Sequence, residues 1–359
     1  MPTTHLALAR AQAFCDANDL RIPILLAPMA GACPPSLSIA IANAGGLGAC
    51  GALLMQPAAI WSWAARVRAG GGGGFQLNLW IPDAPPTRDA VVEDAARAFL
   101  GRWGPAVARD AGEAGLPDFA AQCDAMLDIG PAAISSIMGV YPPAFVEKLK
   151  ARGIKWFATA TTVTEAKCAE SAGADAIIAQ GMEAGGHRGA FDAAKAETEL
   201  VGLFSLLPAV VDAVAVPVIA AGGIADSRGV AAALVLGASA VQMGTGFLRC
   251  PEAGLPSAWA DAIGRSLPEQ TLVTRAFSGR AGRSLATAFA RAASAADAPS
   301  PAPYPVQRGL TQAMRDAATK ANDIDRLQAW AGQSGARALA LPAGVIAAKL
   351  WEDAQLALR

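Results

Sequence analysis

The chain alternates short apolar runs with longer segments in which apolar residues recur at helical spacing. The runs are rich in Ile, Val, Leu and Ala and end at Gly, Pro or polar residues, as strands do. We predict strands at Ile22–Leu26, Leu47–Cys50, Phe75–Trp80, Ala132–Ile137, Ile154–Ala158, Asp175–Gln180, Pro217–Ala220 and Ala238–Met243. Helices are predicted before Ile22 and at Ser36–Ala44, Pro57–Ala69, Pro142–Ala151, Val163–Ala172, Leu200–Val214 and Asp226–Leu236.

The predicted strands are apolar without alternation, which indicates a parallel sheet covered by helices on both faces. Eight such strands alternating with helices favour a (β/α)8 TIM barrel over a doubly wound open sheet. Two segments break this rhythm, a helical stretch at about 82–128 and the residues after 250. We therefore predict an α/β protein with a barrel at 1–250, a helical insertion at about 82–128 outside it, and an added, mostly helical domain at 251–359.

Composition narrows the function. The net charge is -1, and the scattered Lys and Arg give no basic field for nucleic acid. The most apolar stretch, Leu203–Ile224, contains Asp212 and two prolines, so we expect a buried helix and strand and no membrane span. No signal peptide is expected, and six dispersed cysteines suggest reduced thiols in a cytoplasmic protein. With two histidines and no ligand-spaced cluster, no metal site is predicted.

Glycine-rich turns end the last two predicted strands, at Ala221–Ile224 and at Gln242–Gly246. Barrels commonly bind phosphate at the turns after strands seven and eight, where glycines let backbone N–H groups face an anion. Glycines required only by packing are the alternative, and the pairing of two such turns favours phosphate. The turn at Ala27–Gly31 after the first strand could face a planar ligand or be a plain tight turn.

The stretch Gln180–Phe191 follows the sixth predicted strand and contains His187 among glycines. A histidine can transfer protons near neutral pH, and a loop at the barrel mouth favours function over a structural role. No G-x-S-x-G elbow or Cys-His pattern indicates a hydrolase. A phosphate site next to a histidine at the barrel mouth predicts a bound phosphorylated cofactor. His187 would then act as an acid or base, or would position the reacting groups.

At these residues the chain resembles the nitronate monooxygenase family, formerly called 2-nitropropane dioxygenases. Two C-terminal motifs, Phe277–Arg283 (FSGRAGR) and Trp330–Gln333 (WAGQ), resemble its class I branch. That likeness implies that the C-terminal domain closes over the barrel mouth. The other matching segments are Leu26–Ala32, Asn43–Ala52, Phe75–Trp80, Gly153–Ala166, Gly173–Phe191, Val216–Asp226 and Gly237–Leu248.

The resemblance implies FMN as cofactor, His187 as the catalytic residue, and oxidation of alkyl nitronates such as propionate 3-nitronate, or of nitroalkanes, by O2 to a carbonyl product and nitrite. It implies Pro28 and Met29 beside the isoalloxazine, and Asn78 and Gln180 at its polar edge or ribityl chain. It implies a phosphate grip from Gly185, Gly222, Gly223, Gln242, Met243, Gly244 and Thr245. A small-molecule substrate is expected, without nucleic-acid or membrane partners, and a homodimer is left open.

Three other functions stay open. An FMN-dependent enoyl-acyl-carrier-protein reductase has a mouth motif that also resembles Gly181–His187. An NAD(P)H:quinone reductase of the same superfamily is the second alternative. A non-catalytic FMN-binding or sensor protein is the third. The two C-terminal motifs favour the monooxygenase.

Overall fold

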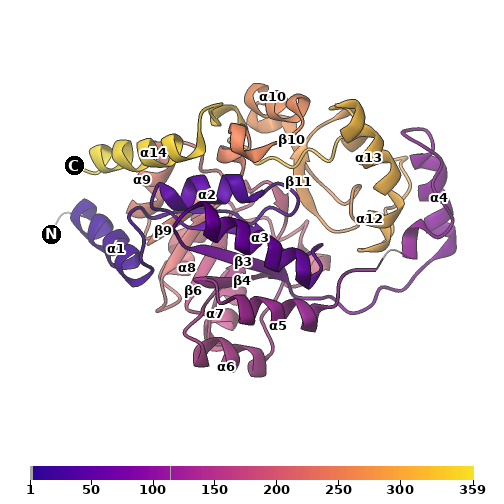
Figure 1. The fold of residues 1–359 in the computed structure, drawn as a ribbon. Helices are drawn as coiled ribbons and strands as arrows, with labels where there is room; N and C mark the ends of the chain where they lie inside the picture. The colour runs from indigo at the N-terminus through magenta and orange to yellow at the C-terminus, as the bar shows by residue number, and fades with distance from the viewer. Residues whose placement is uncertain (1–2, 114) are drawn as a thin grey trace.

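The computed structural model describes residues 3–113 and 115–359 and contains a parallel eight-stranded barrel (Figure 1). Its strands follow the order β1-β9-β8-β6-β5-β4-β3-β2, and a parallel bridge between Leu25 and Leu47 joins the two end strands. The predicted TIM barrel is confirmed, with each strand within two residues of its predicted bounds. The barrel strands are β1 (Ile24–Leu26), β2 (Gly48–Gly51), β3 (Phe75–Trp80), β4 (Ala133–Ile137), β5 (Lys155–Ala160), β6 (Ala176–Gln180), β8 (Val218–Ala221) and β9 (Ala240–Met243).

Helices surround the barrel, and the last of them comes from the end of the chain. Helix α14 (Ala343–Ala357) packs between α9 and α2, so it closes the outer ring beside the last strand (Figure 1). Residues 343–357 therefore lie on the barrel wall, although the sequence groups them with the domain over the mouth. The other ring helices are α2 (Pro35–Asn43), α3 (Pro57–Gly70), α5 (Phe119–Ile129), α6 (Pro143–Ala151), α7 (Val163–Ser171), α8 (Leu203–Val211) and α9 (Ser227–Val235).

Between β9 and α14 the chain leaves the barrel and builds the C-terminal domain at the mouth. Its small antiparallel sheet has the order β10-β11-β7, in which β7 (Gly186–His187) belongs to the loop after β6. The sheet thus joins the predicted histidine loop to the C-terminal domain. The remaining elements of the domain are β10 (Thr271–Thr274), β11 (Gly282–Leu285), α10 (Ser257–Arg265), α11 (Ala288–Ala292), α12 (Val306–Leu310) and α13 (Gln312–Ala321). Single 3-10 turns occur at Ala111–Glu113, Ala193–Lys195, Thr245–Phe247, Pro251–Ala253, Pro268–Gln270 and Gly335–Arg337.

The stretch predicted as an insertion at about 82–128 divides into two parts. Helix α4 (Ala90–Leu100) packs on α12, and Ala96 and Leu100 share an apolar cluster with Phe277 and Phe289 of the C-terminal domain. Helix α5, by contrast, packs on α3 and belongs to the barrel ring. The excursion outside the barrel thus ends before α5, because the buried residues of that helix face its ring neighbours.

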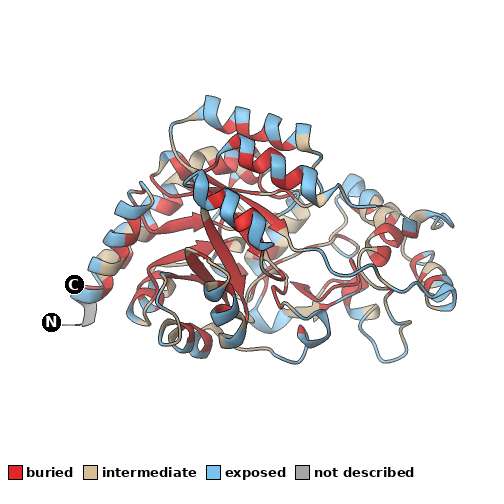
Figure 2. Cartoon of the chain, turned by 90° about the horizontal axis from the view of Figure 1, so that it is seen from below, coloured by how far each residue is buried: buried red, intermediate tan, exposed pale blue. Residues whose placement is uncertain are grey.

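The bottom of the barrel is closed by the N-terminal segment. Phe14, at the end of α1 (Thr3–Ala17), lies inside one apolar cluster with Leu25, Phe157 and Ile219 from three strands. The rings of Phe14 and Phe157 have centroids 6.3 Å apart. Figure 2 shows the buried strands at the centre and ring helices with buried inner and exposed outer faces. With its lower end filled in this way, the barrel as described has its ligand-sized cavity at the carboxyl end.

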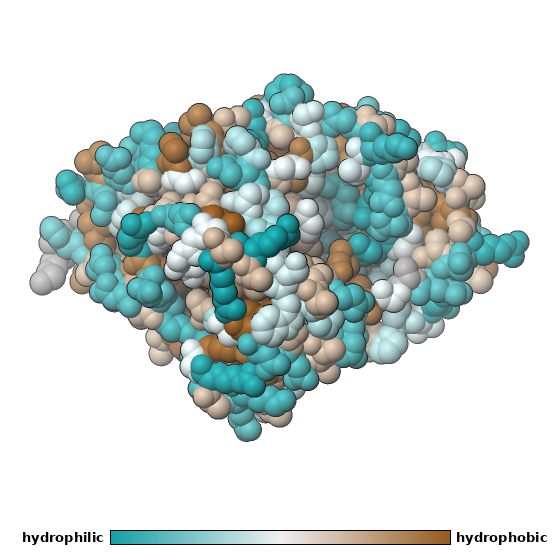
Figure 3. All heavy atoms as spheres, in the orientation of Figure 1, coloured by the Kyte–Doolittle hydropathy of each residue, from teal (hydrophilic) through white to brown (hydrophobic). Residues whose placement is uncertain are grey.

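Among the described residues, no helix is long and apolar enough to cross a membrane. The apolar stretch Leu203–Ile224 forms α8 and β8, as predicted. On the face shown in Figure 3, hydrophobic residues occur in separate spots among hydrophilic ones.

Phe14→Ala should remove this plug and lower the free energy of unfolding by about 3 kcal/mol, since the ring leaves a cavity that its neighbours cannot fill. Leu6→Ala on the same helix is the control, because Leu6 is exposed and its loss should cost less than about 0.5 kcal/mol. Urea unfolding followed by circular dichroism measures both. Equal losses would mean that α1 does not plug the barrel.

Candidate active site

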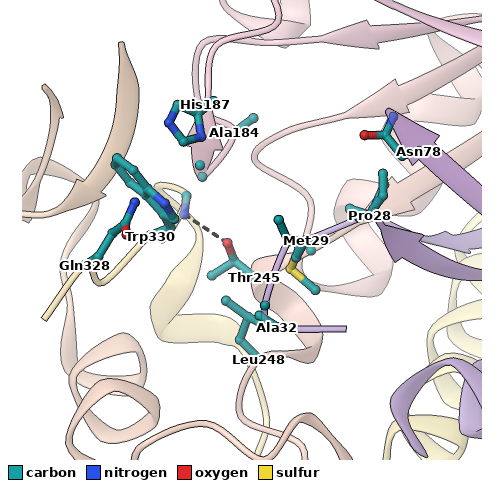
Figure 4. A pocket seen from close by; sticks show the side chains of 18 of the residues that line it. Pro28, Met29, Ala32, Asn78, Ala184, His187, Thr245, Leu248, Gln328 and Trp330 are labelled. Atoms are coloured by element: carbon teal, nitrogen blue, oxygen red, sulfur yellow. Dashed lines mark hydrogen bonds between the residues drawn. The ribbon is translucent and has the colours of Figure 1, made fainter. Parts of the chain in front are cut away.

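A cavity of about 590 Å³ lies at the carboxyl ends of the barrel strands, between them and the C-terminal domain. Its size suits a cofactor together with a small substrate. Figure 4 shows Pro28 and Asn78 at one end, His187 with Trp330 at the other, and Met29 and Thr245 between them. All the predicted site residues line this cavity: Pro28, Met29, Asn78, Gln180, Gly185, His187, Gly222, Gly223, Gln242, Met243, Gly244 and Thr245.

The two glycine-rich turns present unused backbone donors. The N–H groups of Gly222, Gly223, Gly244 and Thr245 donate to no other group in the described chain. Gly222 and Gly223 have φ angles of 104° and 68°, and a Cβ on Gly222 would lie 3.0 Å from the backbone nitrogen of Ala184. Converging free N–H groups form an anion-binding concavity, so the turns fit a phosphate.

A strap of the C-terminal domain, residues 330–334, covers these turns. The Gly332 N–H donates to Thr245 Oγ1 at 2.9 Å, the bond drawn in Figure 4, and Ser334 Oγ donates to the Gly223 carbonyl at 2.6 Å. Gly185 lies directly against the strap, since a Cβ there would collide with the backbone of Ala331 and Gly332. Gly185 therefore serves the packing of the strap, and the strap encloses the end of the cavity that the two glycine-rich turns form.

The turn after β1 is held by a thiol. The Met29 N–H donates to Cys33 Sγ at 3.3 Å, and the thiol donates to the Ala27 carbonyl at 3.2 Å. Burial raises the pKa of Cys33 to about 12, so it remains a thiol. The bonds fix the Pro28–Met29 backbone as one wall of the cavity.

Two amides on the barrel strands leave one polar atom each for a ligand. Asn78 Nδ2 donates to Ser135 Oγ at 3.0 Å, which leaves Oδ1 without a partner in the described residues. Gln242 Oε1 accepts from Gln76 Nε2 at 3.0 Å, which leaves Gln242 Nε2 without a hydrogen-bond partner among the described residues. The cavity floor thus offers an acceptor and a donor, as the polar edge of a heterocycle requires.

His187 is held between two indoles and a serine. Its ring centroid lies 4.6 Å from Trp80 and 4.9 Å from Trp330, both in edge-to-face geometry. His187 Nε2 lies 2.8 Å from Ser278 Oγ, and Ser278 Oγ donates to the Arg280 carbonyl at 3.1 Å. We assign the imidazole proton to Nε2, because the Ser278 hydroxyl proton is used on the Arg280 carbonyl, and this assignment leaves Nδ1 as the basic nitrogen.

The surroundings of His187 disfavour its protonated form. Desolvation by burial and then the positive charges of Arg280 and Arg308 lower its pKa to about 3. Arg280 is buried and paired with Asp83, whereas Arg308 lines the cavity without a salt bridge to any described residue. The substrate end therefore combines a neutral imidazole with excess positive charge.

Several residues that line the cavity were not predicted from the sequence. Trp80 lies two residues after Asn78 on β3, so strand alternation could have placed both at the mouth. Ser278 and Trp330 fall inside motifs that carry the family resemblance but give no roles by themselves. Tyr304 and Arg308 had no local signal, because the C-terminal fold alone brings them to the cavity.

No cluster of three or more His, Cys, Asp or Glu able to hold a metal occurs among the residues described. The six cysteines are free, and five are buried.

Comparisons with known proteins agree along nearly the whole chain. A family model described as nitronate monooxygenase matches residues 13–352. A probable nitronate monooxygenase of Staphylococcus aureus (strain Newman) is 35% identical over 331 residues, covering 91% of this chain and 93% of the relative.

Two kinds of solved structure are also similar. Nitroalkane oxidase from Streptomyces ansochromogenes has a TM-score of 0.87 and 36% identity, covering 97% of this chain and 100% of its own. FabK from Thermotoga maritima has a TM-score of 0.74 and 27% identity, covering 96% of each chain.

Gly185→Ala should displace the strap, since the added methyl group meets backbone atoms that cannot rotate away. Hydrogen exchange of the Gly332 and Gln333 N–H groups should speed up at least roughly tenfold, as their bonds to Thr245 and Glu183 open. Gly72→Ala is the control, because nothing lies within 4 Å of its added Cβ. Unchanged exchange in Gly185→Ala would refute the strap contact.

Proposed function

The chain belongs to the nitronate monooxygenase family and is an oxidoreductase, and on that premise we propose that it oxidises alkyl nitronates with O2 by means of bound FMN. The expected substrates include propionate 3-nitronate, and the products are nitrite and a carbonyl compound. The observation that carries the proposal is a neutral histidine in a positively charged cavity that also contains an anion-binding pair of turns.

The residues present fit FMN. The free N–H groups of Gly222, Gly223, Gly244 and Thr245 would hold its phosphate, and the backbone of Pro28 and Met29 would flank its ring system. Asn78, Gln180 and Gln242 would meet its polar groups. Bound FMN would supply the redox chemistry by accepting electrons from the substrate and passing them to O2. Ser334 and Gly332 would shield the phosphate from water by closing the strap.

The charges at the substrate end favour an anion. A nitronate is negatively charged and a nitroalkane is neutral, while Arg308 and Arg280 add positive charge near His187. An anion in a partly desolvated cavity gains most from such charges. His187 need not remove a proton from a nitronate and would orient it beside the cofactor. We therefore propose that nitronates are preferred over nitroalkanes.

With a neutral nitroalkane, His187 would act as the base. Ser278 holds Nε2, so Nδ1 can accept the α-proton of the substrate. The resulting imidazolium is disfavoured by Arg280 and Arg308, and the nitronate formed beside it offsets that penalty. Proton abstraction should therefore be slower than oxidation of a nitronate supplied as such.

The direct test combines cofactor analysis with a nitrite assay. The purified protein should contain FMN and release nitrite from propionate 3-nitronate in air. Anaerobic mixing separates the alternatives: the nitronate should reduce the flavin, and NAD(P)H should not. Rapid reduction by NAD(P)H alone would support the enoyl reductase or quinone reductase activity suggested by the likeness to FabK, and would contradict the proposal. Bound flavin without nitrite release would indicate a non-catalytic flavoprotein.

His187→Asn should keep FMN and lower kcat/KM for nitroethane roughly 100-fold or more, because the general base is lost. The loss for propionate 3-nitronate should be much smaller, since that substrate needs no deprotonation. Nitrite release by both substrates measures the difference. Equal activity of the variant and the parent toward nitroethane would exclude His187 as the base.

The pH dependence of nitroethane oxidation follows from the lowered pKa of His187. An unshifted imidazole, with a pKa of about 6.5, would lose its base form and about tenfold or more in kcat/KM between pH 7 and 5. With a pKa near 3, the base form persists in this range, so kcat/KM should stay nearly constant. A decline with a midpoint between pH 6 and 7 would contradict this.

A further inference from the structure

Arg188 is a buried cation directly behind the cavity wall. Its side chain is only 1% exposed, and Nη1 donates to the Gly181 carbonyl at 2.8 Å and to Gln180 Oε1 at 3.2 Å. Its Nε and Nη2 atoms are buried and have no hydrogen-bond partner within the described residues. Such a charge is costly to bury, so its position calls for an explanation beyond packing.

Among the described residues, no carboxylate neutralises Arg188 by direct contact. Glu165 uses its oxygens to accept from the N–H groups of Thr161 and Phe191 and from the Thr161 hydroxyl. Glu183 uses both of its oxygens on the Leu203 N–H. Burial lowers the pKa of Arg188 to about 10, which still leaves it charged at neutral pH. Arg188 thus touches two groups, the Gly181 carbonyl and the Gln180 amide, and the amide is the side chain of the two that lines the cavity.

Hydrogen bonds with Arg188 and with the neighbouring backbone fix the orientation of the Gln180 amide. Oε1 accepts from the Gly189 N–H at 2.8 Å and from Arg188, and neither of these groups can accept a hydrogen bond. Nε2 donates to the His187 carbonyl at 3.2 Å, which cannot donate. A flipped amide would break all three bonds. One hydrogen of Nε2 is therefore left for the cavity that Gln180 lines.

A cation on the oxygen of an amide polarises it and strengthens its N–H as a donor. We propose that Arg188 is a positioning residue that acts through Gln180, aiming a polarised N–H at the bound flavin and so favouring the negatively charged, reduced cofactor. The inference rests on the proposed function only in taking FMN as the ligand. The same amide holds the backbone of His187, so Arg188 also couples the cofactor wall to the histidine.

The test is the midpoint potential of the bound flavin, measured in purified holoenzyme. Arg188→Met should lower the potential, because the reduced flavin loses stabilisation of its negative charge. Arg283→Met is the matched control: Arg283 is also buried near the loop, but it bonds to Met182 and Thr271 and not to Gln180. Its shift should be distinctly smaller. A parent-like potential in Arg188→Met, or equal shifts in both variants, would overturn the proposal.

A double-mutant cycle tests the route through the amide. In a Gln180→Met background, Arg188→Met should produce little further shift. A full further shift would show that the charge acts without Gln180 and would overturn the proposal. If the Arg188→Met protein retains no flavin, the Gln180→Met protein is the test, because it keeps Arg188 in place. A lowered midpoint potential of its flavin supports the proposed effect through the Gln180 amide, and an unchanged potential overturns it.

These outcomes are distinct from failure of the proposed function. Parent protein that binds FMN but releases no nitrite would refute the proposed reaction and leave the potential measurements valid. Parent protein that releases nitrite, with potentials unaffected by Arg188→Met, would refute only the role of Arg188.

Discussion

A histidine kept neutral beside the buried Arg280 and the cavity-lining Arg308 is the physical constraint on which this site depends. His187 is packed between Trp80 and Trp330, and desolvation of the ring disfavours an imidazolium. Arg280 and Arg308 disfavour the imidazolium further. The same positive charges that keep His187 neutral also attract an anion to the cavity. The protonation state of His187 and the preferred charge of the substrate therefore have one cause.

The fold provides this enclosure by interrupting its last βα unit. After β9 the chain builds the C-terminal domain and then returns as α14 to the barrel wall, so the domain is tied to the barrel at both ends. The sheet β10-β11-β7 and the strap 330–334 then fasten it across the mouth. One side of the cavity thereby comes from strand ends and the other from residues that are remote in sequence.

The parts that could be predicted from sequence are those with local causes. Uninterrupted apolar runs located the eight strands, and ordinal position identified the turns at Gly222–Gly223 and Gln242–Thr245. The family resemblance supplied the cofactor-site set that lines the cavity. Ser278, Tyr304, Arg308 and Trp330 could not be assigned, because their positions depend on tertiary packing of the C-terminal domain. The packing of α14 on the barrel wall was not predicted for a related reason. The sequence shows that the helix has an apolar face but not which element this face packs against.

The most direct test of the account is the protonation state of His187, read by NMR from its labelled imidazole. The chain has two histidines, so a His5→Gln background leaves His187 as the only signal. The chemical shifts should be those of a neutral ring, protonated at Nε2, and should stay unchanged from pH 8 to pH 5. A titration with a midpoint between pH 6 and 7 would contradict it.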